Sequence, residues 1–235
     1  AQEDYAGYLF TFFPNNSDER VYFATSKDGM NFKDLNDESP VLESTVGTEG
    51  LRDPYLIRSN EGDRFWLIGT DLSIGTSDKS VGWGDAQYRG SLSLVVWEST
   101  DLVNWSEPRL VDTGIRNVGC VWAPEAIYDE KTGEYVVFWA SMTTFEDNSH
   151  QVMYYAKTRD FVTFTEPKEY IDRGKQEEYA SIQAPHCIDL SMVKAGDSYY
   201  RVSADGEITI EKSDSVLGDW KIISTLKSLS ENMEG

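Results

Sequence analysis

Three acidic residues stand in similar short units of this sequence, and their carboxyl groups could act as acid and base. Asp53, Glu125 and Asp189 each open an apolar stretch, and a glycine follows after nine, eight and seven residues, respectively. Breaking a glycosidic bond with inversion uses two such groups, because one protonates the leaving oxygen and the other activates water on the opposite face of the sugar. In such enzymes the two groups stand roughly 6.5–9.5 Å apart, so that water fits between them. Acids on separate strands around one channel could reach this spacing.

The elements that would hold these acids are short strands in a repeated order. Four segments share an alternating apolar run, then Ser or Thr, Asp and an aromatic residue; they span residues 21–32, 94–105, 153–164 and 209–220. Asp and Ser side chains in such places bond nearby backbone, so each segment predicts a strand that ends in a polar turn. Upstream of three of them, the acid, the glycine and an aromatic strand predict a hairpin. The unit therefore has about four strands, as in a propeller blade.

These units predict an all-β fold, a β-propeller whose first strands line a central channel. Alternation with period two dominates, and apolar residues at helical spacing are not sustained. A β-sandwich is the alternative, but it would not explain one acid per unit at the same place. Residues 7–32 lack an acidic first strand and match the later strands of a blade. We expect a single domain over residues 1–235 that represents about four blades and ends before its C-terminal blade or blades.

The amino-acid composition limits the classes of molecule that the chain is expected to bind. The chain has 41 acidic and 21 basic residues, a formal net charge of -20. This charge argues against nucleic acid and anionic membranes, which proteins bind through clustered Lys and Arg, and it suits a neutral sugar. No apolar run is long enough to span a membrane, and residues 1–4 lack the basic start of a signal peptide. We expect a soluble, exported protein in its mature form, secreted or periplasmic.

Cysteine and histidine are scarce. Cys120 and Cys187 each lie in an apolar stretch and are expected to be buried free thiols, because two cysteines are too few for a disulfide framework. His150 and His186 are too few and too far apart in sequence to predict a transition-metal site.

Five motifs in order resemble glycoside hydrolase family 43 along essentially the whole chain. They are Tyr8-Leu9-Phe10-Thr11, Arg52-Asp53-Pro54, Trp122-Ala123-Pro124-Glu125, Ile188-Asp189 and Met233-Glu234-Gly235. Leu190 stands where the family often has Pro, and the Pro that usually follows the Glu-Gly pair is missing. The resemblance implies a five-bladed β-propeller with a funnel of carboxylates, here truncated at the C-terminus.

The resemblance also implies roles for three acids. Asp53 would be the general base and Glu234 the general acid. Asp189 would orient the acid and tune its pKa, because a nearby like charge keeps a carboxyl group protonated.

Three further residues are expected to bind substrate: Glu125, Trp122 and Arg52. Glu125 would contact the sugar or shape the funnel, and Trp122 adjoins that position and could stack on a sugar ring.

The implied activity is that of an inverting, exo-acting hydrolase that removes α-L-arabinofuranosyl or β-D-xylosyl units from plant cell-wall polysaccharides or oligosaccharides. No cofactor is required, although a structural calcium ion is an option because some relatives hold one. The protein would be a monomer or part of a larger multi-domain chain. The alternatives are a fructan-cleaving propeller, whose Asn-Asp-Pro segment this chain lacks, and a propeller that binds carbohydrate without catalysis.

Overall fold

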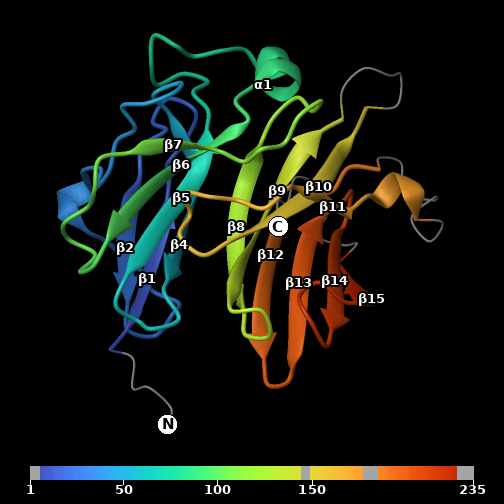
Figure 1. Ribbon diagram of the computed structural model, residues 1–235. Helices are drawn as coiled ribbons and strands as arrows, with labels where there is room; N and C mark the ends of the chain where they lie inside the picture. The colour runs from blue at the N-terminus through green and yellow to red at the C-terminus, as the bar shows by residue number, and fades with distance from the viewer. Residues whose placement is uncertain (1–5, 144–148, 177–184, 227–235) are drawn as a thin grey trace.

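The fold is built from four antiparallel sheets that follow one another along the chain (Figure 1). The computed structural model describes residues 6–143, 149–176 and 185–226. In these residues the chain forms a β-propeller of four blades, numbered here in sequence order. The strands β4, β8 and β12 lie toward the middle of the molecule (Figure 1).

Each blade is a simple up-and-down sheet. The first blade contains β1 (Tyr8–Phe12), β2 (Tyr22–Ser26) and β3 (Lys33–Asp34). The second contains β4 (Leu51–Arg58), β5 (Phe65–Asp71), β6 (Ser93–Ser99) and β7 (Arg109–Asp112). The third contains β8 (Trp122–Asp129), β9 (Glu134–Met142), β10 (Gln151–Thr158) and β11 (Lys168–Ile171). The fourth contains β12 (Ile188–Ala195), β13 (Ser198–Ala204), β14 (Ile208–Ser213) and β15 (Lys221–Thr225).

Helical structure is sparse among the described residues. The helix α1 (Trp83–Arg89) lies in the long connection between β5 and β6, at the top of Figure 1. Two short 3₁₀ turns, η1 (Asn36–Glu38) and η2 (Arg173–Lys175), complete the inventory.

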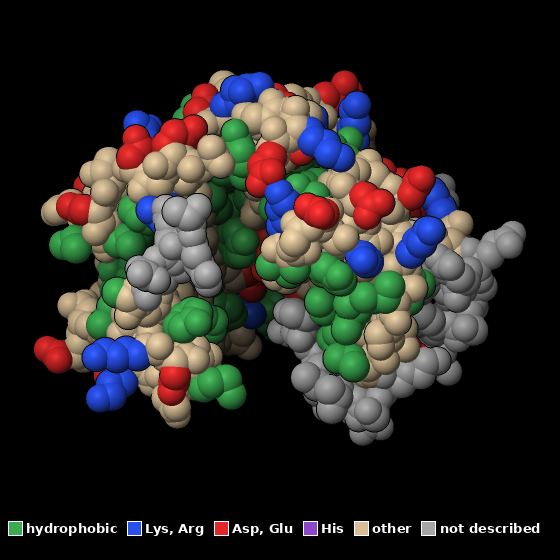
Figure 2. Space-filling model, turned by 90° about the horizontal axis from the view of Figure 1, so that it is seen from below, with side chains coloured by type: hydrophobic (Ala, Val, Ile, Leu, Met, Phe, Trp, Pro, Cys, Tyr) green, Lys and Arg blue, Asp and Glu red, His purple; other side chains and the backbone are tan. Residues whose placement is uncertain are grey.

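The core lies between successive blades, because the strands alternate apolar side chains to both faces. Leu67 and Trp97 of the second blade pack toward Phe23 of the first. Trp66 of the second blade packs toward Trp139 of the third. A separate cluster joins the third and fourth blades. Seen from below, hydrophobic side chains gather around a hollow between the two sides of the molecule (Figure 2).

The repeated Ser/Thr-x-Asp segments form the predicted polar turns. In the second blade, Asp101 Oδ1 accepts hydrogen bonds from the amides of Val103 and Asn104. Asp28 and Asp160 accept the corresponding amides in the first and third blades. These bonds favour the charged carboxylate, so they lower the pKa of Asp101 and of its two counterparts.

The first strand of each complete blade carries a β-bulge at the same place. In β4, Arg52 pairs with Thr70 and Tyr55 with Ile68, so two residues of β4 stand opposite one residue of β5. The same shift follows Trp122 in β8 and Ile188 in β12. A bulge re-aims the side chains next to it, and it commonly lies beside an active site.

The all-β propeller prediction is confirmed, with four blades represented. The β-sandwich alternative is wrong, because four sheets follow one another instead of two sheets facing each other. The fifth blade and the single-domain boundaries stay predictions.

Candidate active site

The three acids predicted from the repeat line one pocket. Asp53, Glu125 and Asp189 come from β4, β8 and β12, and the pocket that they share has a volume of about 200 Å³. Its remaining lining consists of neighbours on the same strands, listed as Pro54, Tyr55, Ala123, Pro124 and Leu190. Three carboxyl groups in so small a space favour chemistry that needs one acid protonated and another ionised.

Asp53 occupies the bulge of β4. Its backbone is in the left-handed region, with φ 52°, which Asp adopts more readily than most residues. Its Oδ2 accepts a hydrogen bond from the hydroxyl of Thr70 at 2.7 Å. The carboxylate is therefore held from the neighbouring strand β5.

Asp189 occupies the equivalent place in β12. It follows Ile188 as Asp53 follows Arg52, and its φ is 51°. Leu190 takes the place that Pro54 holds in β4, so the departure from the family pattern leaves the bulge intact.

Glu125 reaches the pocket from a different register. The bulge position of β8 is held by Ala123, with φ 47°, and Glu125 lies two residues farther along the strand. The expectation that every unit has its acid at the same place is therefore wrong for the third blade. The prolines explain the difference, because Pro54 and Pro124 correspond, and Asp53 precedes its proline whereas Glu125 follows its own.

The electrostatic setting of Glu125 favours a neutral carboxyl group. Burial raises its pKa from 4.5 to about 8, and the negative charge of Asp189 acts in the same direction. Hydrogen bonding to Ser191 and to the backbone of Met192 opposes the shift in part. Its Oε2 is buried and has no hydrogen-bond partner within the described residues. Burial thus favours the neutral form of Glu125, which could donate a hydrogen bond into the pocket.

Tyr55 is a neighbour of Glu125 that the sequence did not single out. It takes the register position in β4 that Glu125 takes in β8. Burial raises the pKa of its hydroxyl, and the charge of Glu125 adds to the shift. Tyr55 therefore keeps its proton, and it is one of the residues that line the pocket.

Arg52 and Trp122 occupy matching positions just before the bulges of β4 and β8. The Arg52 guanidinium lies over the rings of Phe13 and Trp83, at 4.5 and 5.0 Å from their centroids. Its Nη1 also pairs with Glu19 at 3.1 Å. Trp83, at the start of α1, stands edge-on to Trp122 with ring centroids 6.1 Å apart. These contacts join Arg52, Trp83 and Trp122 into one structure, called here the aromatic rim.

The sequence offers Trp83 as one of several aromatic residues that could stack on a sugar ring, but it gives no reason to prefer Trp83 to Trp122; the long β5–β6 connection carries it. It is 47% exposed although its ring contacts Arg52 and Trp122, so it keeps an open surface beside the pocket. The expected substrate contacts of Arg52, Trp122 and Glu125 stay predictions. Glu234, the expected general acid, lies outside the described residues.

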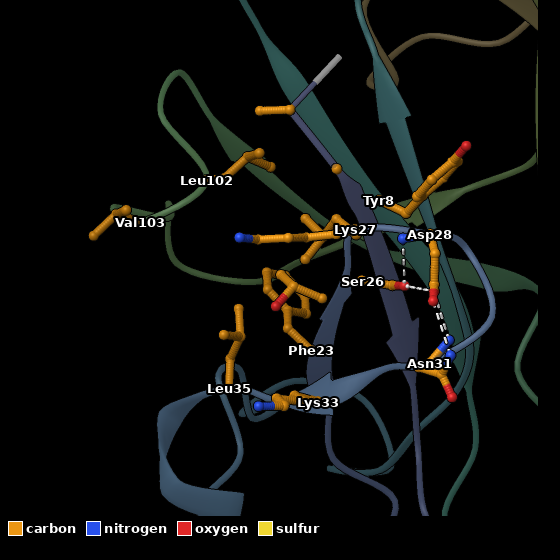
Figure 3. Close-up of a pocket in the computed structure, with 14 residues that line it drawn as sticks. Tyr8, Phe23, Ser26, Lys27, Asp28, Asn31, Lys33, Leu35, Leu102 and Val103 are labelled. Carbon is orange, nitrogen blue, oxygen red and sulfur yellow. Dashed lines mark hydrogen bonds between the residues drawn. The ribbon is translucent and has the colours of Figure 1, made fainter.

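A larger cavity, of about 830 Å³, lies elsewhere, between the first blade and the turn after β6 (Figure 3). Its walls include the apolar side chains of Phe23, Leu35 and Leu102. Among the described residues that line it, Asp28 is the one acid, and it is already bonded to Ser26 and to Asn31. The described walls of this cavity therefore do not bring several carboxyl groups together as the smaller pocket does.

Other predictions can be placed as well. Cys120 and Cys187 are buried free thiols, as expected, and burial raises the pKa values of their thiols to about 12 and about 11. Within the described ranges, no three His, Cys, Asp or Glu side chains are grouped to hold a metal ion. The calcium ion stays a prediction. No helix in the described part of the chain is both long and apolar enough to cross a membrane.

Comparison with known proteins identifies the family of the chain. A family model described as a probable glycosyl hydrolase domain, related to glycoside hydrolase family 43, matches residues 3–235. An α-L-arabinofuranosidase of Bifidobacterium longum subsp. longum is 34% identical over a region that covers 92% of this chain and 20% of that protein. The chain thus spans about a fifth of the length of this relative.

Solved structures share the fold. A family 43 β-1,3-galactosidase has a TM-score of 0.62 at 15% identity, over 95% of this chain and 44% of its own. An exo-β-1,3-galactanase from Clostridium thermocellum has a TM-score of 0.63 at 12% identity, over 95% of this chain and 46% of its own. An N-acetylgalactosamine deacetylase from F. plautii has a TM-score of 0.65 at 14% identity, over 96% of this chain and 67% of its own. The match over nearly the whole chain shows that this protein belongs to the family of probable glycosyl hydrolase domains related to glycoside hydrolase family 43.

Proposed function

We propose that this chain supplies the catalytic pocket of an inverting glycoside hydrolase that removes single α-L-arabinofuranosyl units from plant cell-wall polysaccharides, with β-D-xylosyl units as the second choice. The main support is the meeting of Asp53, Glu125 and Asp189 in one small pocket. The curated relative adds support for arabinose, because it is an α-L-arabinofuranosidase.

In this mechanism Asp53 is the general base. It removes a proton from a water molecule while the water oxygen bonds to the anomeric carbon of the sugar. The bond from that carbon to the leaving oxygen breaks at the same time, and the general acid protonates the leaving oxygen. Glu234 takes this second role in the proposal, and Asp189 orients it and keeps it protonated by like charge.

Glu125 binds the sugar as a neutral acid in this proposal. A buried carboxyl group with a pKa of about 8 carries its proton at neutral pH. Its buried Oε2, without a hydrogen-bond partner among the described residues, suits a sugar hydroxyl. A neutral Glu125 adds no negative charge next to Asp53 and Asp189. It therefore does not oppose the ionisation of these two carboxyl groups.

The size of the pocket supports removal of one unit at a time. Its volume of about 200 Å³ is below the range of roughly 300–1,000 Å³ that is typical of clefts for drug-sized ligands. A single terminal sugar fits such a space better than a chain does. The aromatic rim would then hold the rest of the polysaccharide, because aromatic faces bind the apolar face of a sugar ring.

The other expectations follow from this substrate. We place the protein outside the cytoplasm, secreted or periplasmic, where plant polysaccharides are met. A neutral polymer is also compatible with the net charge of -20, which would repel anionic partners.

The test is hydrolysis of 4-nitrophenyl α-L-arabinofuranoside, β-D-xyloside and β-D-galactoside, with the anomer of the first product followed by NMR. We expect cleavage of the arabinofuranoside with inversion. Asp53→Asn should lower kcat by about 10⁴-fold with the fold intact, because the base is lost. Near-normal rates for Asp53→Asn would place the base elsewhere, and a folded protein that binds arabinan without cleaving any substrate would support the non-catalytic alternative.

Glu125 and Glu234 can be told apart by the leaving group. Removal of a general acid slows substrates with poor leaving groups far more than 2,4-dinitrophenyl glycosides, which need no protonation. We expect this pattern for Glu234→Gln and not for Glu125→Gln. The opposite pattern would assign the acid to Glu125.

A further inference from the structure

Thr70 connects two neighbouring blades at the pocket. Its side chain is fully buried near the end of β5. Its hydroxyl donates a hydrogen bond to Asp53 Oδ2 at 2.7 Å and accepts one from the backbone amide of Ala123 at 2.8 Å. A hydroxyl has one proton, and the amide of Ala123 occupies an acceptor position of its oxygen, so the proton is directed at Asp53.

We propose that Thr70 is a positioning residue for hydrolysis, which fixes the orientation of the Asp53 carboxylate through the backbone of the next blade. This inference rests on the proposed role of Asp53 as general base. It adds a residue that touches no substrate, and it makes the geometry of the base depend on the contact between the second and third blades.

The sister blades show that the bulge does not need this hydroxyl. Thr70 pairs with Arg52 just before the bulge of β4. The residues in the same register are Ala140, opposite Trp122, and Ala204, opposite Ile188. Both strands bulge in the same way with alanine at this position. The backbone therefore does not need the hydroxyl of Thr70 to form the bulge. The one hydrogen bond that this hydroxyl donates goes to the Asp53 carboxylate.

The effect on catalysis would be both geometric and electrostatic. A carboxylate can turn about its side-chain bonds, and a charge-assisted hydrogen bond from a buried donor restricts that rotation. The same bond favours the ionised form, which a general base must have before it can take a proton from water. Small errors in the position of a catalytic group cost up to about 100-fold in rate.

The test compares three variants. Thr70→Val keeps the shape of the side chain and removes both hydrogen bonds, and Thr70→Ser keeps the hydroxyl. Thr209→Val is the matched control, because Thr209 is equally buried and its hydroxyl donates to Asp205 Oδ1 at 2.8 Å, outside the pocket.

We expect Thr70→Val to lower kcat on the aryl arabinofuranoside by about 100-fold, with a much smaller change in KM, because the loss concerns orientation of the base. The acidic side of its kcat/KM–pH profile should move to higher pH. Thr70→Ser should restore most of kcat and the wild-type profile. Thr209→Val should unfold at lower urea concentration and keep the wild-type kcat and pH profile.

Wild-type kcat and an unshifted profile in Thr70→Val would overturn the inference, and so would an equal loss of kcat in Thr209→Val. A crystal structure of Thr70→Val gives a second reading that needs no activity. It should show the Asp53 carboxylate turned away while the bulge remains, and an unmoved carboxylate refutes the positioning role. An inactive wild-type protein would instead count against the proposed function.

Discussion

Replacing Glu125 by Gln should change how the stability of the fold depends on pH. The Glu125 carboxyl has a pKa of about 8 in the folded protein, against an ordinary value of 4.5. Between these two values the unfolded chain releases the proton and the folded chain keeps it. The contribution of protonated Glu125 to the free energy of unfolding is therefore fully present below pH 4.5, and it falls as the pH rises toward 8.

The size of the effect follows from the two pKa values. One pH unit in this window is worth about 1.4 kcal/mol, so a rise from pH 5.5 to 8 lowers the free energy of unfolding by about 3 kcal/mol through this one group. Gln has a similar shape and no proton to lose. The variant should therefore gain about 3 kcal/mol relative to the wild type over the same rise in pH.

Urea unfolding at pH 5.5, 7 and 8.5 measures this difference. The other titrating groups act equally in both proteins and cancel in the comparison. Glu166→Gln makes the same chemical change at an exposed position and is the control. A difference between Glu125→Gln and wild type that stays constant within about 1 kcal/mol would refute a buried, neutral Glu125.

Three other outcomes follow from the packing. Trp83→Ala should raise KM for an arabinose-substituted polysaccharide by about tenfold, since an aromatic contact is worth roughly 1 kcal/mol or more, and should leave kcat on aryl glycosides unchanged in the same steady-state assays. Glu211→Ala should lower the free energy of unfolding by about 3–5 kcal/mol in urea titrations, because buried Glu211 pairs with two buried arginines that would keep their charges. The pKa of Glu211 is lowered in the fold by these arginines against the effect of burial, so its contribution should fade as the pH falls. Cys120 and Cys187 should not react with a thiol reagent at pH 8 until the protein unfolds, because both are buried with raised pKa values; fast labelling of the native protein would contradict their burial.

Local patterns allowed the fold to be predicted from the sequence. A turn such as Ser99-x-Asp101 forms its hydrogen bonds within a few residues, so it leaves the same signature wherever it recurs. The acids were found for the same reason, since Asp53 and Asp189 each open a strand before a glycine turn. The repeat therefore located three pocket residues with no knowledge of how the blades pack.

What the sequence did not reveal depends on contacts between distant strands. The register of Glu125 is set by which residues of β8 and β9 pair, and only the alignment of Pro54 with Pro124 hinted at it. Nothing in the sequence distinguishes Thr70 from the other threonines. Only the folded structure shows its hydrogen bonds to Asp53 and Ala123. Glu19 likewise does not stand out among 41 acidic residues, yet it is fully buried and accepts hydrogen bonds from the β5–β6 connection.

The bulge of β8 has a consequence for how such proteins diversify. Ala123 sits in a backbone conformation that disfavours alanine and suits Asp, Asn or Gly, and the corresponding places in β4 and β12 already hold Asp. The three bulges thus provide three equivalent positions around one pocket. In β8 this position holds alanine, whose side chain has no polar or ionisable group. Position 123 can therefore accept a polar side chain without a change of backbone, whereas Asp53 and Asp189 already carry the proposed catalytic roles. A library at position 123, rich in Asp, Asn and Gly, is the place where directed evolution of sugar preference would begin.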